Sequence, residues 1–172
     1  MAKSVKTQIV LDADVVIHFA KGGRLSQLPS IFPDYEYVLL ETVHEELKEI
    51  RPQVDNQIML LKNITLLPFA PRGEMLHEYA MLRSRFGKGE SACMAYCLFT
   101  HNVIGSSNLR DIRAYCEEKK ITYLTTMDFL WYAWRKQMLT PAEISAFIHE
   151  VKQKGSKLSE VDIEKYVCQK VL

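Results

Sequence analysis

The sequence has no excess of charge of either sign, no long apolar run and no closely paired cysteines. Its 172 residues include 22 Lys and Arg against 21 Asp and Glu, which gives a formal net charge of +1. This balance provides no global attraction to nucleic acid, so any RNA contact has to rest on a local basic patch. No apolar run approaches the roughly 20 residues that a membrane helix needs, which argues against a membrane-spanning chain.

The chain also has no C-x-x-C pair and no pattern typical of an export signal. The apolar stretch at 9–19 contains Asp12 and Asp14, which spoil the apolar region of a signal peptide. We therefore expect a cytoplasmic protein with reduced, buried thiols rather than disulfides. The cysteines are Cys93, Cys97, Cys116 and Cys168.

Short runs rich in branched residues alternate with longer helical patterns, without repeats, low-complexity stretches or long linkers. This alternation is typical of an α/β fold with a mostly parallel sheet. We predict one domain with three layers, α/β/α, in which a core at about 7–140 precedes a helical C-terminal extension at about 141–172. The five predicted strands are 7–11, 35–40, 64–67, 103–105 and 121–124.

Helices are predicted between and after these strands. Two of them begin with the pattern of a capping box, in which a Thr and a Glu three residues later satisfy free backbone N–H groups. These pairs are Thr42 with Glu45 and Thr140 with Glu143. The predicted helices are 15–21, 25–31, 42–61 with an interruption at Pro52, 74–86, 90–101, 109–119, 127–137, 142–152 and 160–171.

Four carboxylates fall near strand ends or at the starts of helices. Asp12 ends the first strand, and Glu46 lies in the helix after the second. Glu90 begins a helix, and Asp111 lies just beyond the fourth strand. In a doubly wound sheet these places meet beyond the carboxyl ends of the strands. Converging carboxylates repel one another, and hard oxygen ligands suit Mg²⁺ or Mn²⁺, so the pattern predicts a metal site.

Each of these residues also has a purely structural interpretation. Asp12 and Asp14 are placed to cap the helix after the first strand. Glu90 is placed to complement a helix dipole, and Asn108 is placed as an N-cap with Asp111 as its partner. Taken singly, the structural interpretation is favoured for every residue except Asp12. An aspartate that ends an apolar strand is the least like a surface residue.

Over about 7–127 the order and spacing of four motifs resemble the PIN-domain ribonuclease family. Residues 9–17, IVLDADVVI, resemble its opening strand and L-D-x-[NS], and residues 43–47, VHEEL, are similar to V-x-x-E-L in the register that selects Glu46. Residues 87–92, GKGESA, resemble its G-x-G-E turn, and residues 106–112, SSNLRDI, resemble the T-x-N-x-x-D-F element of toxin-type members. The motifs are weak singly and fairly specific together. The chain departs from the pattern at Ala13, Ser106, Asn108 and Ile112, and Asn108 stands where other branches place aspartate.

The resemblance implies a ribonuclease that hydrolyses RNA with one or two Mg²⁺ or Mn²⁺ ions. Its metal-binding and catalytic residues would be Asp12, Glu46, Glu90 and Asp111, with Asn108, Ser106 and Asp14 supporting them. It also implies a homodimer and, for toxin-type members, a small antitoxin as partner. Five cations near the motifs are candidates for RNA phosphate contacts, with solvated helix faces as the equal alternative. They are Arg83, Arg85, Lys88, Arg110 and Arg113.

Two other functions stay open. A haloacid-dehalogenase-type phosphatase would use Asp12 as nucleophile and Asp14 as acid. Ser106 to Asn108 stand where its downstream acidic pair belongs, which argues against it. The other alternative is a catalytically silent PIN-like module that binds RNA or protein, and Asn108 is the residue that favours it.

Overall fold

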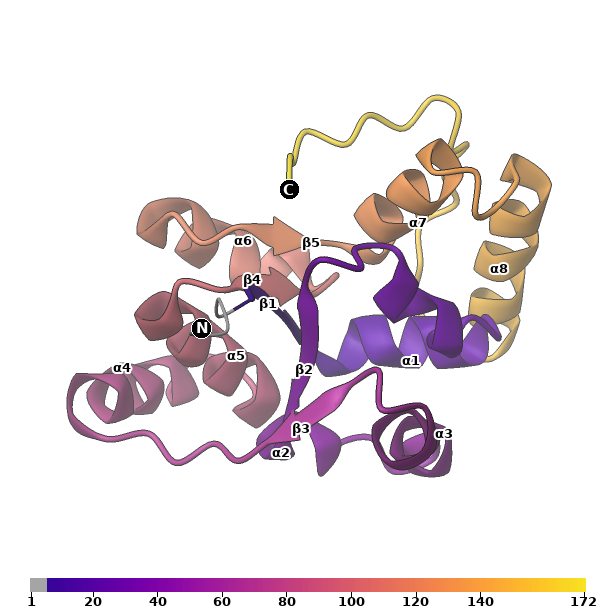
Figure 1. Cartoon of the computed structure of the whole chain (residues 1–172). Helices are drawn as coiled ribbons and strands as arrows, with labels where there is room; N and C mark the ends of the chain where they lie inside the picture. Colours follow the sequence, from indigo (N-terminus) through magenta and orange to yellow (C-terminus); the bar gives the residue numbers. More distant parts are fainter. Residues whose placement is uncertain (1–5) are drawn as a thin grey trace, which may run out of the picture.

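The computed structural model describes residues 6–172, in which a parallel five-stranded sheet lies between two layers of helices (Figure 1). The strand order is β3-β2-β1-β4-β5, and every neighbouring pair is parallel. The order reverses between β1 and β4, which defines the switch point of a doubly wound sheet. This arrangement confirms the predicted fold class. The strands are β1 Gln8–Leu11, β2 Glu36–Leu40, β3 Thr65–Leu67, β4 Val103–Gly105 and β5 Tyr123–Leu124.

The helices α4, α5 and α6 lie on one side of the sheet, and α1, α7 and α8 lie on the other (Figure 1). No helix within residues 6–172 combines the length and the apolar character needed to cross a membrane. The helical elements are α1 Ala13–Lys21, η1 Leu25–Ser30, α2 Glu41–His44, α3 Arg51–Asn56, η2 Gln57–Leu61, α4 Gly73–Arg83, α5 Lys88–Thr100, α6 Leu109–Lys119, α7 Thr126–Arg135 and α8 Pro141–Gln153.

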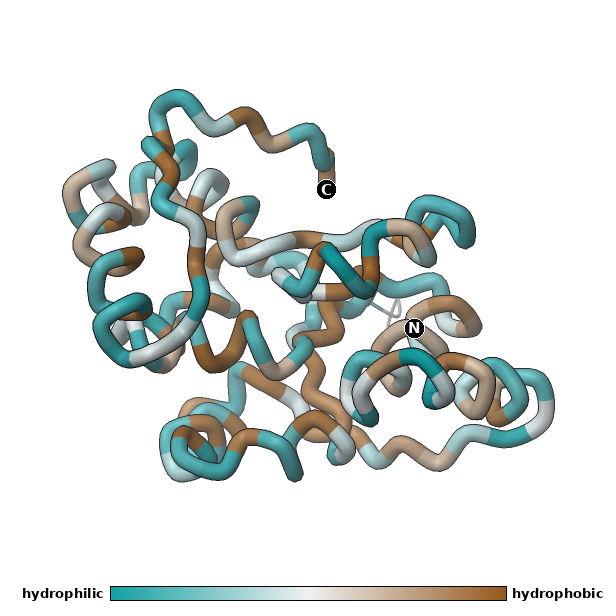
Figure 2. Tube along the Cα trace, turned by 180° about the vertical axis from the view of Figure 1, so that it is seen from behind, coloured by the Kyte–Doolittle hydropathy of each residue, from teal (hydrophilic) through white to brown (hydrophobic). Residues whose placement is uncertain are grey.

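The core lies on both faces of the central strands. Ile9, Val10 and Leu11 of β1 are fully buried, as parallel strands covered by helices on both faces require. Figure 2 shows hydrophobic stretches in the middle of the molecule, whereas hydrophilic and hydrophobic segments alternate along the C-terminal tail. Burying one such side chain contributes roughly 1.5–3 kcal/mol. The core therefore fixes the ends of β1 and β4, from which the candidate site is built.

The predicted capping box at Thr42 is wrong. Strand β2 runs directly into α2, so Leu40 is the N-cap and Thr42 falls inside the helix. The Thr42 hydroxyl is buried without a hydrogen-bond partner among the described residues. Glu45 instead pairs with Lys88, at 2.6 Å. Because α2 ends at His44, Glu46 lies in the turn after the helix and not within it.

The predicted helix at 160–171 is also absent. Beyond α8 the described chain has only short turns, at 154–155 and 163–165. From 166 to 172 half-buried and exposed residues alternate, which is the period of an extended chain. Cys168 is half-buried there, whereas the other three cysteines are buried as expected. The predicted box of Thr140 and Glu143 is confirmed, and α8 begins at Pro141.

Candidate active site

Asp12 is the innermost carboxylate at the switch point. It follows β1 directly and is only 3% exposed. Its Oδ1 accepts a hydrogen bond from the Ala13 N–H at 2.8 Å, which makes it the N-cap of α1. Its Oδ2 accepts one from the Ser106 hydroxyl at 3.0 Å, because β4 lies beside β1. Burial raises the pKa of Asp12 well above its usual value, and the charges of Asp14 and Glu90 raise it further.

Asp14 ties the start of α1 to the loop after β4. Its Oδ1 accepts from the Val15 N–H at 2.7 Å, and its Oδ2 accepts from the Ser107 N–H at 2.8 Å. Burial raises the pKa of Asp14 to about 6, although these backbone hydrogen bonds act to lower it. The sequence predicts that Asp14 supports the metal-binding carboxylates, and in the structure its side chain bonds to the loop after β4.

Asn108 connects two further carboxylates. Its side-chain amide donates to Glu90 and to Asp111, the latter at 2.9 Å. Asn108 is the N-cap residue of α6 with Asp111 as its partner, as predicted, but its side chain bonds to the Asp111 carboxylate and to no backbone N–H of the helix. Burial raises the pKa of Glu90, and the negative charges of Asp111 and Asp14 add to the effect. An aspartate at this position would repel Glu90 and Asp111, whereas the amide donates a hydrogen bond to each of them.

Glu46 joins the group through the backbone of α5. Its Oε1 accepts a hydrogen bond from the Gly89 N–H at 2.8 Å, one residue before Glu90. A Cβ on Gly89 would lie 2.9–3.1 Å from the carboxylate atoms of Glu46, so only glycine allows this approach. Unlike Asp12, Glu46 is exposed. The structure thus brings all four predicted carboxylates to one edge of the sheet, with Glu46 on its solvent side.

The chemistry of these donors fits a hard divalent cation, although no preformed cage is present. No group of three or more His, Cys, Asp or Glu within residues 6–172 is arranged to hold a metal ion. The donors are all oxygens, which Mg²⁺ and Mn²⁺ prefer. In the described chain no Lys or Arg forms an ion pair with Asp12, Glu90 or Asp111. Hydrogen bonds and the N-terminal ends of α1, α5 and α6 offset their negative charge instead.

Behind Asp14 lies a hydrogen-bonded chain that the sequence analysis did not identify. The Ser107 hydroxyl bonds to Thr126 Oγ1 at 2.8 Å, and the Thr126 N–H donates back to the Ser107 oxygen at 2.7 Å. Thr126 Oγ1 lies 2.8 Å from Nδ1 of His18, which is 5% exposed. Burial lowers the pKa of His18 to about 4, so the ring is neutral at pH 7. The sequence signal for this contact was His18 itself, a lone histidine within the apolar run of α1.

The predicted phosphate-binding cations divide into two groups. Lys88 pairs with Glu45, and the guanidinium groups of Arg83 and Arg85 contact the Phe86 carbonyl and ring. Arg110 and Arg113 are exposed on α6, the helix that carries Asp111, and they form no ion pair in the described part of the chain. Within residues 6–172, Arg110 and Arg113 are thus the two of these cations whose side chains make no hydrogen bond, ion pair or cation–π contact.

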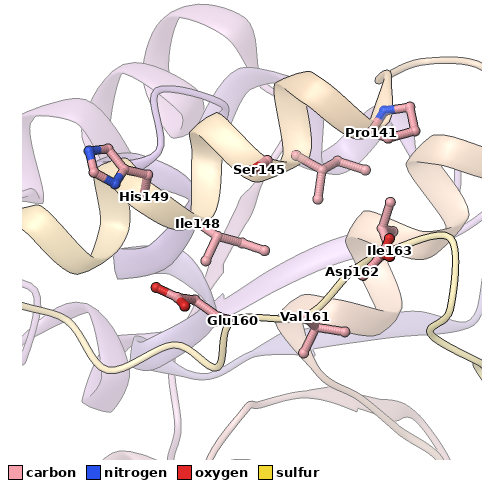
Figure 3. A pocket seen from close by; sticks show the side chains of 9 residues that line it. Pro141, Ser145, Ile148, His149, Glu160, Val161, Asp162 and Ile163 are labelled. Atoms are coloured by element: carbon pink, nitrogen blue, oxygen red, sulfur yellow. The ribbon is translucent and has the colours of Figure 1, made fainter.

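A separate cavity of about 410 Å³ lies between α8 and the C-terminal tail (Figure 3). None of the four carboxylates lines it. Its own carboxylates, Glu160 and Asp162, pair with Lys152 and Lys165. This cavity therefore does not belong to the candidate site.

Comparison with known proteins identifies no relative, because no protein-family model and no curated protein matches the chain. Fold and site together define the class. The chain is a doubly wound α/β protein that holds a cluster of carboxylates, with Asp12 at its centre, where the strand order reverses.

Proposed function

We propose that the protein is a divalent-metal-dependent ribonuclease of the PIN-domain type. The observation that carries this proposal is Asp12, a buried carboxylate with a raised pKa and no cationic partner among the described residues. Glu90 and Asp111 meet beside it through Asn108. Burying negative charge without a counter-charge costs stability, and a bound cation is the usual compensation.

In this proposal Asp12, Glu46, Glu90 and Asp111 hold the ion or ions. When bound, Mg²⁺ or Mn²⁺ supplies an activated water and stabilises the developing charge in phosphodiester hydrolysis. Asn108 orients Glu90 and Asp111, and Ser106 fixes one oxygen of Asp12. The exposed Arg110 and Arg113 bind the RNA phosphates and keep the strand over the carboxylates.

The test is cleavage of a mixed single-stranded RNA pool with added Mn²⁺. Asp12→Asn should lower the rate at least about 100-fold, because loss of a metal ligand exceeds the 10–100-fold typical of its supporting residues. Asp34→Asn is the matched control, since Asp34 is exposed in a turn before β2 and should leave the rate unchanged. Addition of EDTA should abolish cleavage by both the wild type and the control.

The second candidate is a catalytically silent module that binds RNA or protein. The observation in its favour is that residues 6–172 contain no preformed metal-binding group, with Asn108 donating to the carboxylates instead. Mn²⁺ binding by calorimetry separates the two candidates. If Mn²⁺ neither binds nor supports cleavage, the ribonuclease proposal is refuted and the silent module is favoured.

The phosphatase alternative gains no support, because no Lys within residues 6–172 bonds to Asp12 or Asp14. The homodimer and the antitoxin partner stay predictions from the family resemblance.

A further inference from the structure

Glu46 forms part of a second feature, a small pocket of about 220 Å³ beside the candidate site. One wall is Ile17 of α1, one turn beyond Asp14. The opposite wall is the turn that follows α2. The pocket therefore shares a carboxylate with the cluster and opens next to it. Its lining residues are Ile17, Lys21, Glu46, Leu47, Lys48, Glu49 and Ile50.

The turn that forms this pocket is held by hydrogen bonds. The Arg51 guanidinium donates to the carbonyls of His44 and Glu45, each at 3.1 Å. The Lys48 N–H donates to the Glu46 carbonyl at 3.0 Å. Leu47 and Ile50 point into the core and are nearly fully buried. The pocket is thus preformed, which lowers the entropic cost of binding a ligand.

Two cations stand at the rim of the pocket beside apolar surface. The Lys21 ammonium donates to the Lys154 carbonyl at 2.7 Å and to the Ser156 hydroxyl at 2.9 Å, which leaves it one free N–H. Lys48 is exposed and forms no ion pair in the described chain. Glu49 is exposed at the same rim. Half-buried Ile17 gives the same pocket an apolar surface.

We propose that this pocket is a subsite for one nucleotide of single-stranded RNA, adjacent to the bond that is cleaved. This inference rests on the proposed function. The base or ribose lies against Ile17, and the flanking phosphate contacts Lys48 and the free N–H of Lys21. A preformed pocket of this size accepts an unstacked nucleotide, whereas a paired base inside a duplex cannot enter it.

The test is fluorescence anisotropy with a labelled 12-nucleotide single-stranded RNA, with Ca²⁺ replacing Mn²⁺ and intact RNA verified on a gel. Lys48→Glu should raise Kd about tenfold and reduce the salt dependence of binding. Ile17→Ala should raise Kd several-fold, and its thermal unfolding reports whether it remains folded. Lys62→Glu is the matched control, because Lys62 is exposed at the end of η2 and does not line the pocket.

Three outcomes decide the matter. Weaker binding by Lys48→Glu, together with an unchanged Kd for Lys62→Glu and weaker competition by the same sequence in a hairpin stem, supports the subsite. If the wild type cleaves RNA with Mn²⁺ but Lys48→Glu and Ile17→Ala bind as tightly as wild type, the subsite is refuted and the proposed function stands. If the folded wild type neither binds nor cleaves RNA, both are refuted.

Discussion

Asp12 is both a helix cap and the centre of the candidate site. Each of its oxygens has its own hydrogen-bond partner, Ala13 for one and Ser106 for the other. The structural and functional interpretations of this residue therefore do not compete. A cap needs only one acceptor near the first turn, and asparagine serves about as well as aspartate. What distinguishes Asp12 is that a charged group occupies a buried position where a neutral cap would suffice.

This leads to a prediction for Asp12→Asn in metal-free protein. Burial raises the pKa of Asp12 in the folded protein above its value in the unfolded chain. The carboxyl therefore contributes fully to stability below the unfolded pKa, and this contribution is lost as pH rises through the folded pKa. Asparagine at position 12 is neutral at every pH, and its side-chain oxygen still accepts from the Ala13 N–H. At pH 7 with EDTA, urea unfolding should show a gain of about 1 kcal/mol. The gain should shrink as pH falls from the raised pKa of Asp12 towards about 4, and equal destabilisation at every pH would contradict the argument.

At the same scale, the sequence predicts which residues gather at the candidate site and their nearest partners, but not the contact that lies behind them. Asp12, Glu90 and Asp111 are recognisable because each follows a strand or opens a helix. The contact between His18 and Thr126 is not, because these residues lie 108 positions apart and meet only once α1 and α7 pack together. Motifs report local chemistry, whereas such a pair depends on the packing of whole elements.

At the scale of the elements, the ends of helices differ from the prediction where contacts with other elements determine those ends. Helix α5 begins at Lys88, earlier than predicted, and so places Gly89 inside its first turn. There the Gly89 N–H lacks an intrahelical acceptor, as at any helix start, and Glu46 supplies one. The V-x-x-E-L register selects Glu46, and this is the glutamate that bonds to the start of α5, although it lies in a turn and not in the predicted helix.

Gly89→Ala should therefore reduce activity while changing stability little. The new Cβ would lie within 3.1 Å of the Glu46 carboxylate, but that side chain is exposed and flexible and moves away at little cost. Replacing a helical glycine by alanine favours the helix by up to about 1 kcal/mol, so the unfolding free energy should change by less than that. Cleavage with Mn²⁺ should fall about tenfold or more, because a misplaced reactive group is costly.

Gly87→Ala is the control for this prediction. Its Cβ would meet only Glu90 Oε2, at an ordinary 3.8 Å. Its backbone is extended, at φ −61° and ψ 165°, which alanine adopts without strain. Equal loss of activity in both variants would show that the effect does not arise from Glu46.

For the whole molecule, the C-terminal tail shows how a distant contact overrides local propensity. The pattern at 160–171 favours a helix, yet the segment is extended and bonded to α7. Tyr166 and Lys170 donate to the two carboxyl oxygens of Asp128, at 2.7 and 2.8 Å. The Asp128 side chain is 1% exposed and also belongs to the capping box of α7 with Thr125. Sequence pattern alone does not reveal a partner about 40 residues away.

Lys170→Met should destabilise the protein through Asp128. Burial acts to raise the pKa of Asp128, but hydrogen bonds from Lys170, Thr125 and Tyr166 outweigh it and leave the pKa below its usual value. This contribution to stability is therefore present at neutral pH and lost as pH falls below about 4. Removing the ammonium leaves a buried carboxylate short of a partner, and since Lys170 is partly exposed we expect a cost of about 2 kcal/mol at pH 7.

The control is Lys165→Met, which breaks the exposed pair with Asp162 and should cost at most about 0.5 kcal/mol. Urea unfolding of both variants at pH 7 and at pH 3 measures the difference. Asp128 completes the capping box of α7 with Thr125, and the next residue, Thr126, bonds to Ser107 beside Asp14, so these contacts connect the tail to the candidate site. A Lys170→Met variant no less stable than Lys165→Met would mean that α7 and the loop after β4 hold their positions without the tail.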